Sequence, residues 1–334
     1  MKKIVICISL WAGIFAVSCK KSTPEAPEGI PMSFGTAAVS RAVNLVDSEN
    51  INQDENQLTV YDLYTTSGQS VLYMDATQVT CDGSGNWTYS PLKYWTETGT
   101  HAFTAYLSQQ GEITLDGTTS TTSYPTVTYL PENDALNISQ WEITPANQFD
   151  FLYAWHSRNM GTVANPHAPV EFSLNHLLCA VQFNVVNLYD VTTVLNVSNF
   201  TISGLSNTQQ ATLSLSDGNA SYECEQDKEG TGVIKVERTS SVNYNQAYNV
   251  FSGFGTVGDE GYLLMWPHEA GDIFKNLQVS FEQDGSSRSI SLASAGTNNW
   301  SAGQKYVYNL YVKDDRINIQ AEVRPWIIHD IDLD

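Results

Sequence analysis

Cysteine is scarce in this chain: the 334 residues include only 5 cysteines. Cys7 and Cys19 lie near the N-terminus, which leaves Cys81, Cys179 and Cys224 as an odd set with no close pair. No CxxC or metal-type spacing occurs, so a small disulfide-stapled fold and a zinc or thiol-redox motif are excluded. One disulfide among these three cysteines is possible, and their spacing does not say which two would form it. The apolar run around Cys179 favours a buried, inert thiol.

Basic residues are also few. The chain has 16 Lys and Arg against 36 Asp and Glu, which gives a formal net charge of -20. Nucleic-acid binding depends on basic patches, so we expect no nucleic acid as a partner. Hydrophobic residues make up 42% and aromatic residues 11% of the chain, and this excludes global disorder. A length of 334 residues allows one large or two ordinary domains.

Motifs for catalysis are missing. The sequence contains no GxSxG elbow, no HExxH and no glycine-rich phosphate loop leading into a helix. The stretch 82–86 lacks the spaced acids of a calcium loop and predicts a hairpin turn. We therefore expect no enzyme, no cofactor and no metal site. The six histidines are scattered and predict structural or surface roles; they are His101, His156, His167, His176, His268 and His329.

The N-terminus carries an export signal. Lys2 and Lys3 precede an apolar run over 4–17, about 14 residues long, which suits a signal peptide and is too short to span a bilayer. Small residues lead directly to Cys19, as in a lipobox. We expect residues 1–18 to be a lipoprotein signal peptide, Cys19 to carry the lipid, and 19–29 to form a flexible tether. The alternative is an ordinary secretory signal followed by a chance cysteine.

Strand patterns fill the remainder of the chain. Short runs rich in β-branched and aromatic residues alternate with Gly, Asn and Asp turn signals, a pattern typical of β-sandwiches. The one expected helix is short, around 174–180. A glycine- and proline-bearing stretch over 158–169 is the expected domain junction. Strands are expected at 58–64, 71–73, 87–89, 101–107, 149–155, 170–174, 180–186, 200–202, 211–215, 232–236, 262–266, 277–281 and 306–312.

Three segments, in order along the chain, carry a resemblance to a known family. They are the aromatic-rich stretch 87–106, the apolar segment 172–183, and the stretch 300–310, which is followed by Trp326 near the C-terminus. Together with the lipobox, this set resembles the fimbrillin family, the lipoprotein-derived pilus subunits of Bacteroidales. The resemblance covers nearly the whole mature chain.

The resemblance implies an all-β fold of two transthyretin-like Greek-key β-sandwich domains in tandem, here assigned to 30–166 and 167–334. It also implies assembly by donor-strand exchange. An arginine-specific protease removes the first strand of the precursor, and the C-terminal strand of another copy or a related subunit fills the vacancy. The precursor would be lipid-anchored at the outer membrane and the product would be a cell-surface fimbrium.

The N-terminal residues fit such a removable strand. Alternation places Ile30, Met32 and Phe34 on one face of a strand within 30–41. The bond between Arg41 and Ala42 matches the family's cleavage site, and Arg41 is the only arginine before Arg158. An ordinary exposed arginine is the alternative, and an anchoring subunit could keep both lipid and strand.

The C-terminal residues fit a donor strand over 323–334. Ile327, Ile331 and Leu333 share one parity, and aspartates occupy the other. Such a strand can add to an exposed sheet edge, where its apolar side chains set the register. The alternative is that it forms the last strand of the chain's own second domain.

These observations predict a structural subunit of a surface pilus that serves adhesion through a receptor the sequence does not identify. The alternative is a monomeric surface lipoprotein that binds glycans, which exposed aromatic residues in a row would favour. We expect core packing rather than sugar stacking for Trp87, Tyr94, Trp95 and Trp300.

Overall fold

The structure is a computed structural model, and its description covers most of the chain. In this part the protein is built from strands, with η2 (Leu292–Ala295) as a short 3-10 turn, so the predicted all-β class is confirmed. No helix in the described part is long and apolar enough to cross a membrane. The described residues are 29–39, 54–108, 112–115, 118–121, 125–139, 151–205, 211–214, 221–224, 232–252, 261–268, 275–314 and 316–325.

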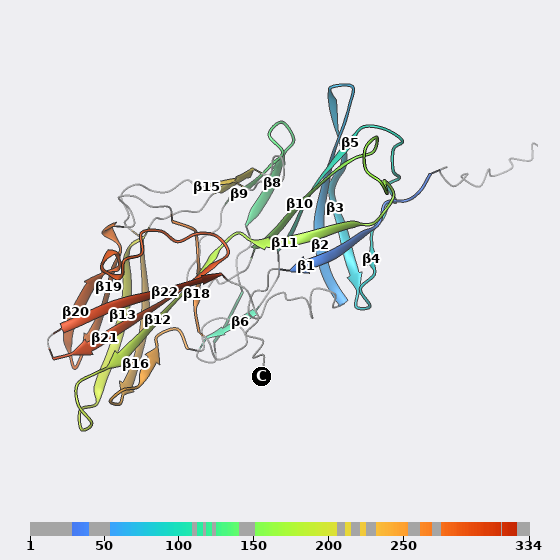
Figure 1. The fold of residues 1–334 in the computed structure, drawn as a ribbon. Coiled ribbons are helices and arrows are strands. Elements are labelled where there is room, and N and C mark those ends of the chain that lie inside the picture. Colours follow the sequence, from blue (N-terminus) through green and yellow to red (C-terminus); the bar gives the residue numbers. More distant parts are fainter. Residues whose placement is uncertain are drawn as a thin grey trace, which may run out of the picture.

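The first half of the chain forms a closed barrel (Figure 1). Neighbouring strands in order are β1 (Phe34–Val39), β11 (Val170–His176), β10 (Phe151–Asn159), β5 (Thr100–Ser108), β2 (Asp54–Thr66), β3 (Gln69–Asp82) and β4 (Trp87–Thr88), which returns to β1. The barrel core is lined by alternate residues of strands such as β5, β10 and β11, as expected where one face of a sheet is buried.

The second half forms a β-sandwich, because two sheets contribute to one core. Phe183, Phe281 and Trp300 are among its fully buried side chains. One sheet has the order β17 (Ala247–Asn249), β12 (Cys179–Asn187), β21 (Gln304–Lys313) and β22 (Arg316–Pro325), with β18 (Leu263–Met265) also paired to β12. The other has the order β16 (Gly232–Val242), β13 (Leu195–Leu205), β19 (Gln278–Gln283) and β20 (Ser286–Ser291).

A third sheet joins the two halves. Its central pair is antiparallel and combines β9 from the first half with β14 from the second, from Ala135↔Ser214 to Ile138↔Ala211. A third core cluster lies here and includes Tyr61 and Leu213, which come from different halves. The strand order is β15 (Ser221–Cys224), β14 (Ala211–Ser214), β9 (Ala135–Ser139) and β8 (Thr126–Leu130); β6 (Glu112–Leu115) and β7 (Thr118–Thr121) form a separate hairpin.

The chain passes from barrel to sandwich through Leu177 and Leu178, both fully buried. The Leu177 amide donates to the Phe151 carbonyl of the barrel at 2.9 Å, and the Leu178 carbonyl accepts from the Gly303 amide at 2.9 Å. The helix expected around 174–180 is wrong. Strand alternation governs this stretch, because every second side chain of β11 enters the barrel core.

The pairing of β11 with β1 and β10 keeps residues 170–176 in the barrel. We therefore propose that the domains meet at 177–178, and the limits expected from the sequence stay a prediction. A closed barrel followed by a sandwich is consistent with the expected tandem arrangement. Cys81 and Cys179 are buried free thiols, as expected for Cys179, whose Sγ donates to the Met265 carbonyl at 3.4 Å.

Candidate functional site

The N-terminal segment 29–39 occupies a slot in the barrel wall (Figure 1). β1 runs parallel to β11, with Phe34 opposite Val170 and Val39 opposite Leu174. On its other side it meets β4 through an antiparallel pairing of Phe34 with Trp87. β1 is therefore the strand that closes the barrel. Without it, β11 and β4 would each present an unpaired edge.

The side chains of this segment alternate between core and solvent. Met32 and Phe34 are 2% and 5% exposed, whereas Pro31 and Ser33 are exposed. Ile30, expected on the same face as Met32, is 49% exposed because it precedes the point where the segment enters the barrel. Only two of the three apolar side chains in the expected strand are thus buried.

Aromatic rings surround Phe34. The ring of Phe172 on β11 lies parallel to it at 5.9 Å between centroids, with 4° between the planes. Phe103 and Tyr89 meet it edge-on at 5.9 and 5.3 Å. Offset-parallel and edge-to-face contacts add to the free energy of burying such rings. Phe34 is therefore the main apolar anchor of the segment.

The residues before β1 are bound by the loop that follows β4. The Met32 amide donates to the Lys93 carbonyl at 2.9 Å, and the Trp95 amide donates to the Ile30 carbonyl at 3.0 Å. The Tyr89 hydroxyl donates to the Met32 carbonyl at 3.1 Å. This loop belongs to the aromatic-rich stretch 87–106 recognised in the sequence, and its role is to hold the N-terminal segment.

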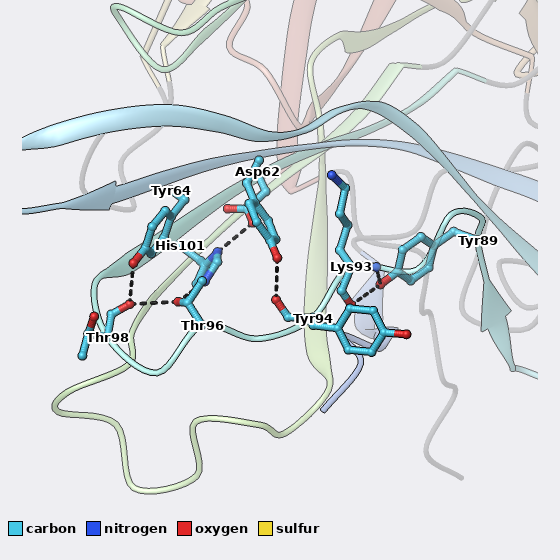
Figure 2. A network of polar contacts seen from close by, with 9 residues as sticks. Asp62, Tyr64, Tyr89, Lys93, Tyr94, Thr96, Thr98 and His101 are labelled. Atoms are coloured by element: carbon cyan, nitrogen blue, oxygen red, sulfur yellow. Dashed lines mark hydrogen bonds and ion pairs between the residues drawn. The ribbon is translucent and has the colours of Figure 1, made fainter. Parts of the chain in front are cut away.

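A polar network that runs from a buried pair to the protein surface holds the loop in turn, as Figure 2 shows. Asp62 Oδ2 and His101 Nδ1 are 2.7 Å apart, and both side chains are fully buried. His101 Nε2 lies 2.9 Å from the Thr96 hydroxyl, which donates to the Thr98 carbonyl at 2.8 Å. The Tyr64 hydroxyl also donates to Thr98, at 2.9 Å. The network connects β2 and β5 to the loop that binds the segment.

Burial raises the pKa of Asp62, although its hydrogen bond and charge interaction with His101 act in the opposite direction. Its Oδ1 atom has no hydrogen-bond partner in the described structure. Cations lie over two aromatic rings nearby: Lys93 is 5.0 Å from the Tyr73 ring and Arg158 is 4.7 Å from the Trp95 ring. These two contacts pack the loop against the barrel.

Residue types for metal binding are not gathered anywhere in the described part, where no group of three or more His, Cys, Asp or Glu could hold an ion. The stretch 82–86 is a hairpin turn between β3 and β4, as expected, and the Asp82 carboxylate accepts from the Ser84 and Asn86 amides at 2.8 and 3.1 Å. Trp87, Trp95 and Trp300 are buried, which confirms packing roles for these three.

The other site residues expected from the sequence lie outside the described residues. β1 ends at Val39, two positions before Arg41 in sequence, and β22 ends at Pro325. The structure thus shows the N-terminal part of the expected removable segment between β11 and β4, and does not describe the cleavage site. Of the expected donor strand 323–334 it describes only 323–325, which form the end of β22 and pair with β21 of the same chain. The undescribed site residues are Cys19, Arg41, Ala42, Ile327, Ile331 and Leu333.

The buried pair of Asp62 and His101 was not foreseen, because 39 residues separate its members. One signal was present: Asp62 interrupts an otherwise apolar and aromatic strand pattern over 58–64. A carboxylate at such a position is buried and requires a partner. His101, expected to be structural, supplies it.

Three solved structures from Bacteroides species have a similar fold. A fimbrial protein from Bacteroides vulgatus is similar, with 15% identity over 88% of this chain and 99% of that one, at a TM-score of 0.56. Candidate cell adhesion proteins from Bacteroides uniformis and Bacteroides ovatus give TM-scores of 0.53 and 0.52 at 12% and 13% identity. These cover 89% and 92% of this chain, and 97% and 100% of their own.

No curated protein matches the chain in sequence. The model of one protein family, described as fimbrillin-like, matches residues 40–326. That match spans most of the chain, including the loop around Tyr94, the Leu177–Leu178 link and both halves of the fold. The chain therefore belongs to the fimbrillin-like family.

Proposed function

We propose that this chain is a structural subunit of a cell-surface fimbrium, exported as a lipoprotein precursor through Cys19 and polymerised by strand exchange. The observation that carries the proposal is the position of β1. It closes the barrel as a terminal strand whose neighbours on both sides, β11 and β4, belong to the rest of the chain.

Cleavage after Arg41 would remove the whole segment 29–39 in one piece. The lost contacts include the Phe34 stack on Phe172 and the backbone hydrogen bonds of Met32. What stays behind is an apolar slot flanked by unpaired strand edges, a combination that pairs readily with an added strand. The empty slot would expose apolar side chains and unpaired backbone groups to water, which costs free energy. Cleavage therefore favours insertion of a strand from another subunit.

The C-terminal sequence offers a strand of matching period. Ile331 and Leu333 are two positions apart, the same spacing as Met32 and Phe34, and the aspartates between and after them would face solvent. A neighbouring copy could thus bury two apolar side chains where β1 buried Met32 and Phe34. The same acidic residues would discourage pairing between uncut subunits.

The test uses a soluble precursor, residues 20–334, treated with an arginine-specific protease. Mass spectrometry is expected to show loss of everything through Arg41, and electron microscopy and unboiled gels are expected to show filaments and SDS-resistant ladders. The variant Arg41→Ala should stay uncut and monomeric. A chain truncated after Pro325 should be cut but stay monomeric, since it lacks the donor residues.

Cleavage without assembly of the full chain would contradict the strand-exchange proposal. Resistance at Arg41 would contradict cleavage there and leave an anchoring subunit as the fimbrial role. For export, labelling cells with a radioactive fatty acid should mark the wild-type chain and not Cys19→Ala. Equal labelling would contradict lipid attachment at Cys19.

A further inference from the structure

A pocket of about 620 Å³ lies at the end of the sandwich that is far from the barrel. β12 starts beside the barrel at Cys179 and runs parallel to β21, so their last residues, Asn187 and Lys313, share the distal end (Figure 1). The volume falls within the usual range for small-molecule sites, roughly 300–1,000 Å³. The lining residues are Leu188, Tyr311, Lys313, Asp314, Arg316, Asn318 and Gln320.

Strand alternation builds the pocket on the solvent face of the sheet. Val312 and Ile319 point into the core, so Tyr311 and Lys313 on β21 and Asn318 and Gln320 on β22 share the opposite face. Tyr311 pairs directly with Asn318 across the two strands. The aromatic ring and the amide are therefore neighbours by register.

The turn at the pocket's edge is fixed by a chain of hydrogen bonds that runs through Tyr189, after β12, to the other sheet. The Tyr189 hydroxyl donates to the Asp314 carbonyl. Gln283 Nε2 donates to the same hydroxyl at 2.6 Å, and Arg288 Nε donates to Gln283 Oε1 at 3.0 Å. Asp314 is held with φ of 52°, a conformation that is uncommon outside glycine. The turn at this edge of the pocket is thus held in one conformation in the absence of a ligand.

The residues that line the pocket place both hydrogen-bond donors and hydrogen-bond acceptors around the Tyr311 ring. Lys313 and Arg316 donate, Asp314 accepts, and the amides of Asn318 and Gln320 do both. Within the described part of the chain, neither Lys313 nor Arg316 forms an ion pair. Hydroxyl groups donate and accept at once, so a dense array of mixed partners suits a polyhydroxylated ligand. Tyr311 and Leu188 supply apolar surface for the carbon face of a sugar ring.

We propose that this distal pocket binds an oligosaccharide, with Tyr311 beneath a sugar ring and Arg316, Asn318 and Gln320 hydrogen-bonded to its hydroxyls. The site makes the chain a receptor-binding protein as well as an assembly unit. It does not depend on strand exchange, because β1 lies in the barrel and the pocket lies at the opposite end of the sandwich.

The test is saturation-transfer NMR on the uncut soluble chain with four probes: lacto-N-tetraose, maltohexaose, 3′-sialyllactose and a hyaluronan hexasaccharide. At least one should bind, and titration calorimetry should then give its affinity. Tyr311→Ala and Arg316→Ala are each expected to weaken binding at least tenfold. Tyr311→Phe, which keeps the ring, should stay within about threefold of the wild type.

Lys235→Ala serves as the matched control, because it removes an exposed cation from the other sheet and should leave binding unchanged. Thermal unfolding of each variant separates loss of the site from loss of the fold. No binding of any probe at 1 mM, or binding that Tyr311→Ala and Arg316→Ala leave intact in folded protein, would overturn the proposal. Binding of acidic probes alone would retain the site and assign its selectivity to Lys313 and Arg316.

Discussion

The Phe34 ring lies parallel to the Phe172 ring at 5.9 Å, so the strand expected to leave the protein is stacked on one that stays. This contact couples closure of the barrel to the presence of the N-terminal segment. The first prediction tests it directly.

Replacing Phe34 with alanine in the uncut chain should lower the free energy of unfolding by about 3–5 kcal/mol, as for other buried aromatic side chains. Denaturant unfolding measures the loss. Ile30→Ala is the control from the same segment, and because Ile30 is 49% exposed its effect should stay below about 1 kcal/mol. Equal losses for the two variants would contradict the anchoring role of Phe34.

Replacing His101 with alanine should be strongly destabilising. The Asp62 carboxylate would stay buried without the partner now 2.7 Å away, and breaking such a pair costs about 3–5 kcal/mol. Chemical denaturation measures this, and proteolysis of the segment 29–39 should accelerate because its loop loses support. Thr96→Val removes the two outer hydrogen bonds of the network, to His101 Nε2 and to the Thr98 carbonyl, and leaves the Asp62–His101 pair in place; it should cost about 0.5–1.5 kcal/mol for each bond. A His101→Ala variant as stable as Thr96→Val would contradict this account.

Stability should fall on acidification because of His268. Burial lowers its pKa from the ordinary value of 6.5, so the unfolded chain binds the proton more readily. The contribution of His268 to the free energy of unfolding is fully present above the pKa that it has in the unfolded chain. It is lost as the pH falls from about 6.5 through the lower pKa of the folded state. Burial and the charge of Arg158 lower the pKa of His156 in the same direction.

Melting temperatures between pH 7.5 and 5 measure the effect. His268→Asn should reduce the slope, since an amide can still donate to the Trp266 carbonyl that His268 Nδ1 meets at 2.8 Å. Combining it with His156→Asn should reduce the slope further. An unchanged slope in the double variant would show that other groups control the acid response.

Asp134 fixes the β8–β9 hairpin to the barrel. Its carboxylate accepts from the Tyr129 hydroxyl at 2.7 Å, the Thr104 hydroxyl at 3.1 Å and Trp155 Nε1 at 2.9 Å. Asp134→Ala should cost at least ~2 kcal/mol, because three donors lose their acceptor. Hydrogen exchange over 126–139 should accelerate. Glu132→Ala, on an exposed residue of the same hairpin, should change neither quantity.

The sequence predicted the strands well where one face of a strand is buried, as in β5 and β12, because alternation reports burial directly. It failed at 174–180, where a helix was expected across the start of the apolar run 177–181. That run is apolar because Leu177 and Leu178 are buried between two halves of the molecule. Local pattern does not distinguish this burial from that of a helix.

Pairing between distant segments was beyond reach for a related reason. The β9–β14 ladder joins residues more than 70 positions apart, and nothing in either short strand specifies the other. The strand expected within 30–41 is present as β1, with Met32 and Phe34 buried and Ile30 exposed, and its removal stays a prediction. The neighbours of this strand could not be predicted from the sequence, because β11 and β4 are distant in sequence and lie beside β1 only in the closed barrel.

The β9–β14 ladder has a mechanical consequence. The described backbone crosses between the halves at Leu177–Leu178, and the ladder forms a second bridge beside that crossing. A force that pulls the barrel away from the sandwich is therefore carried both by the covalent backbone at Leu177–Leu178 and by the hydrogen bonds of the β9–β14 ladder. The ladder resists rotation of one half about the crossing, so the barrel and the sandwich of one chain are expected to move as a single stiff unit under tension.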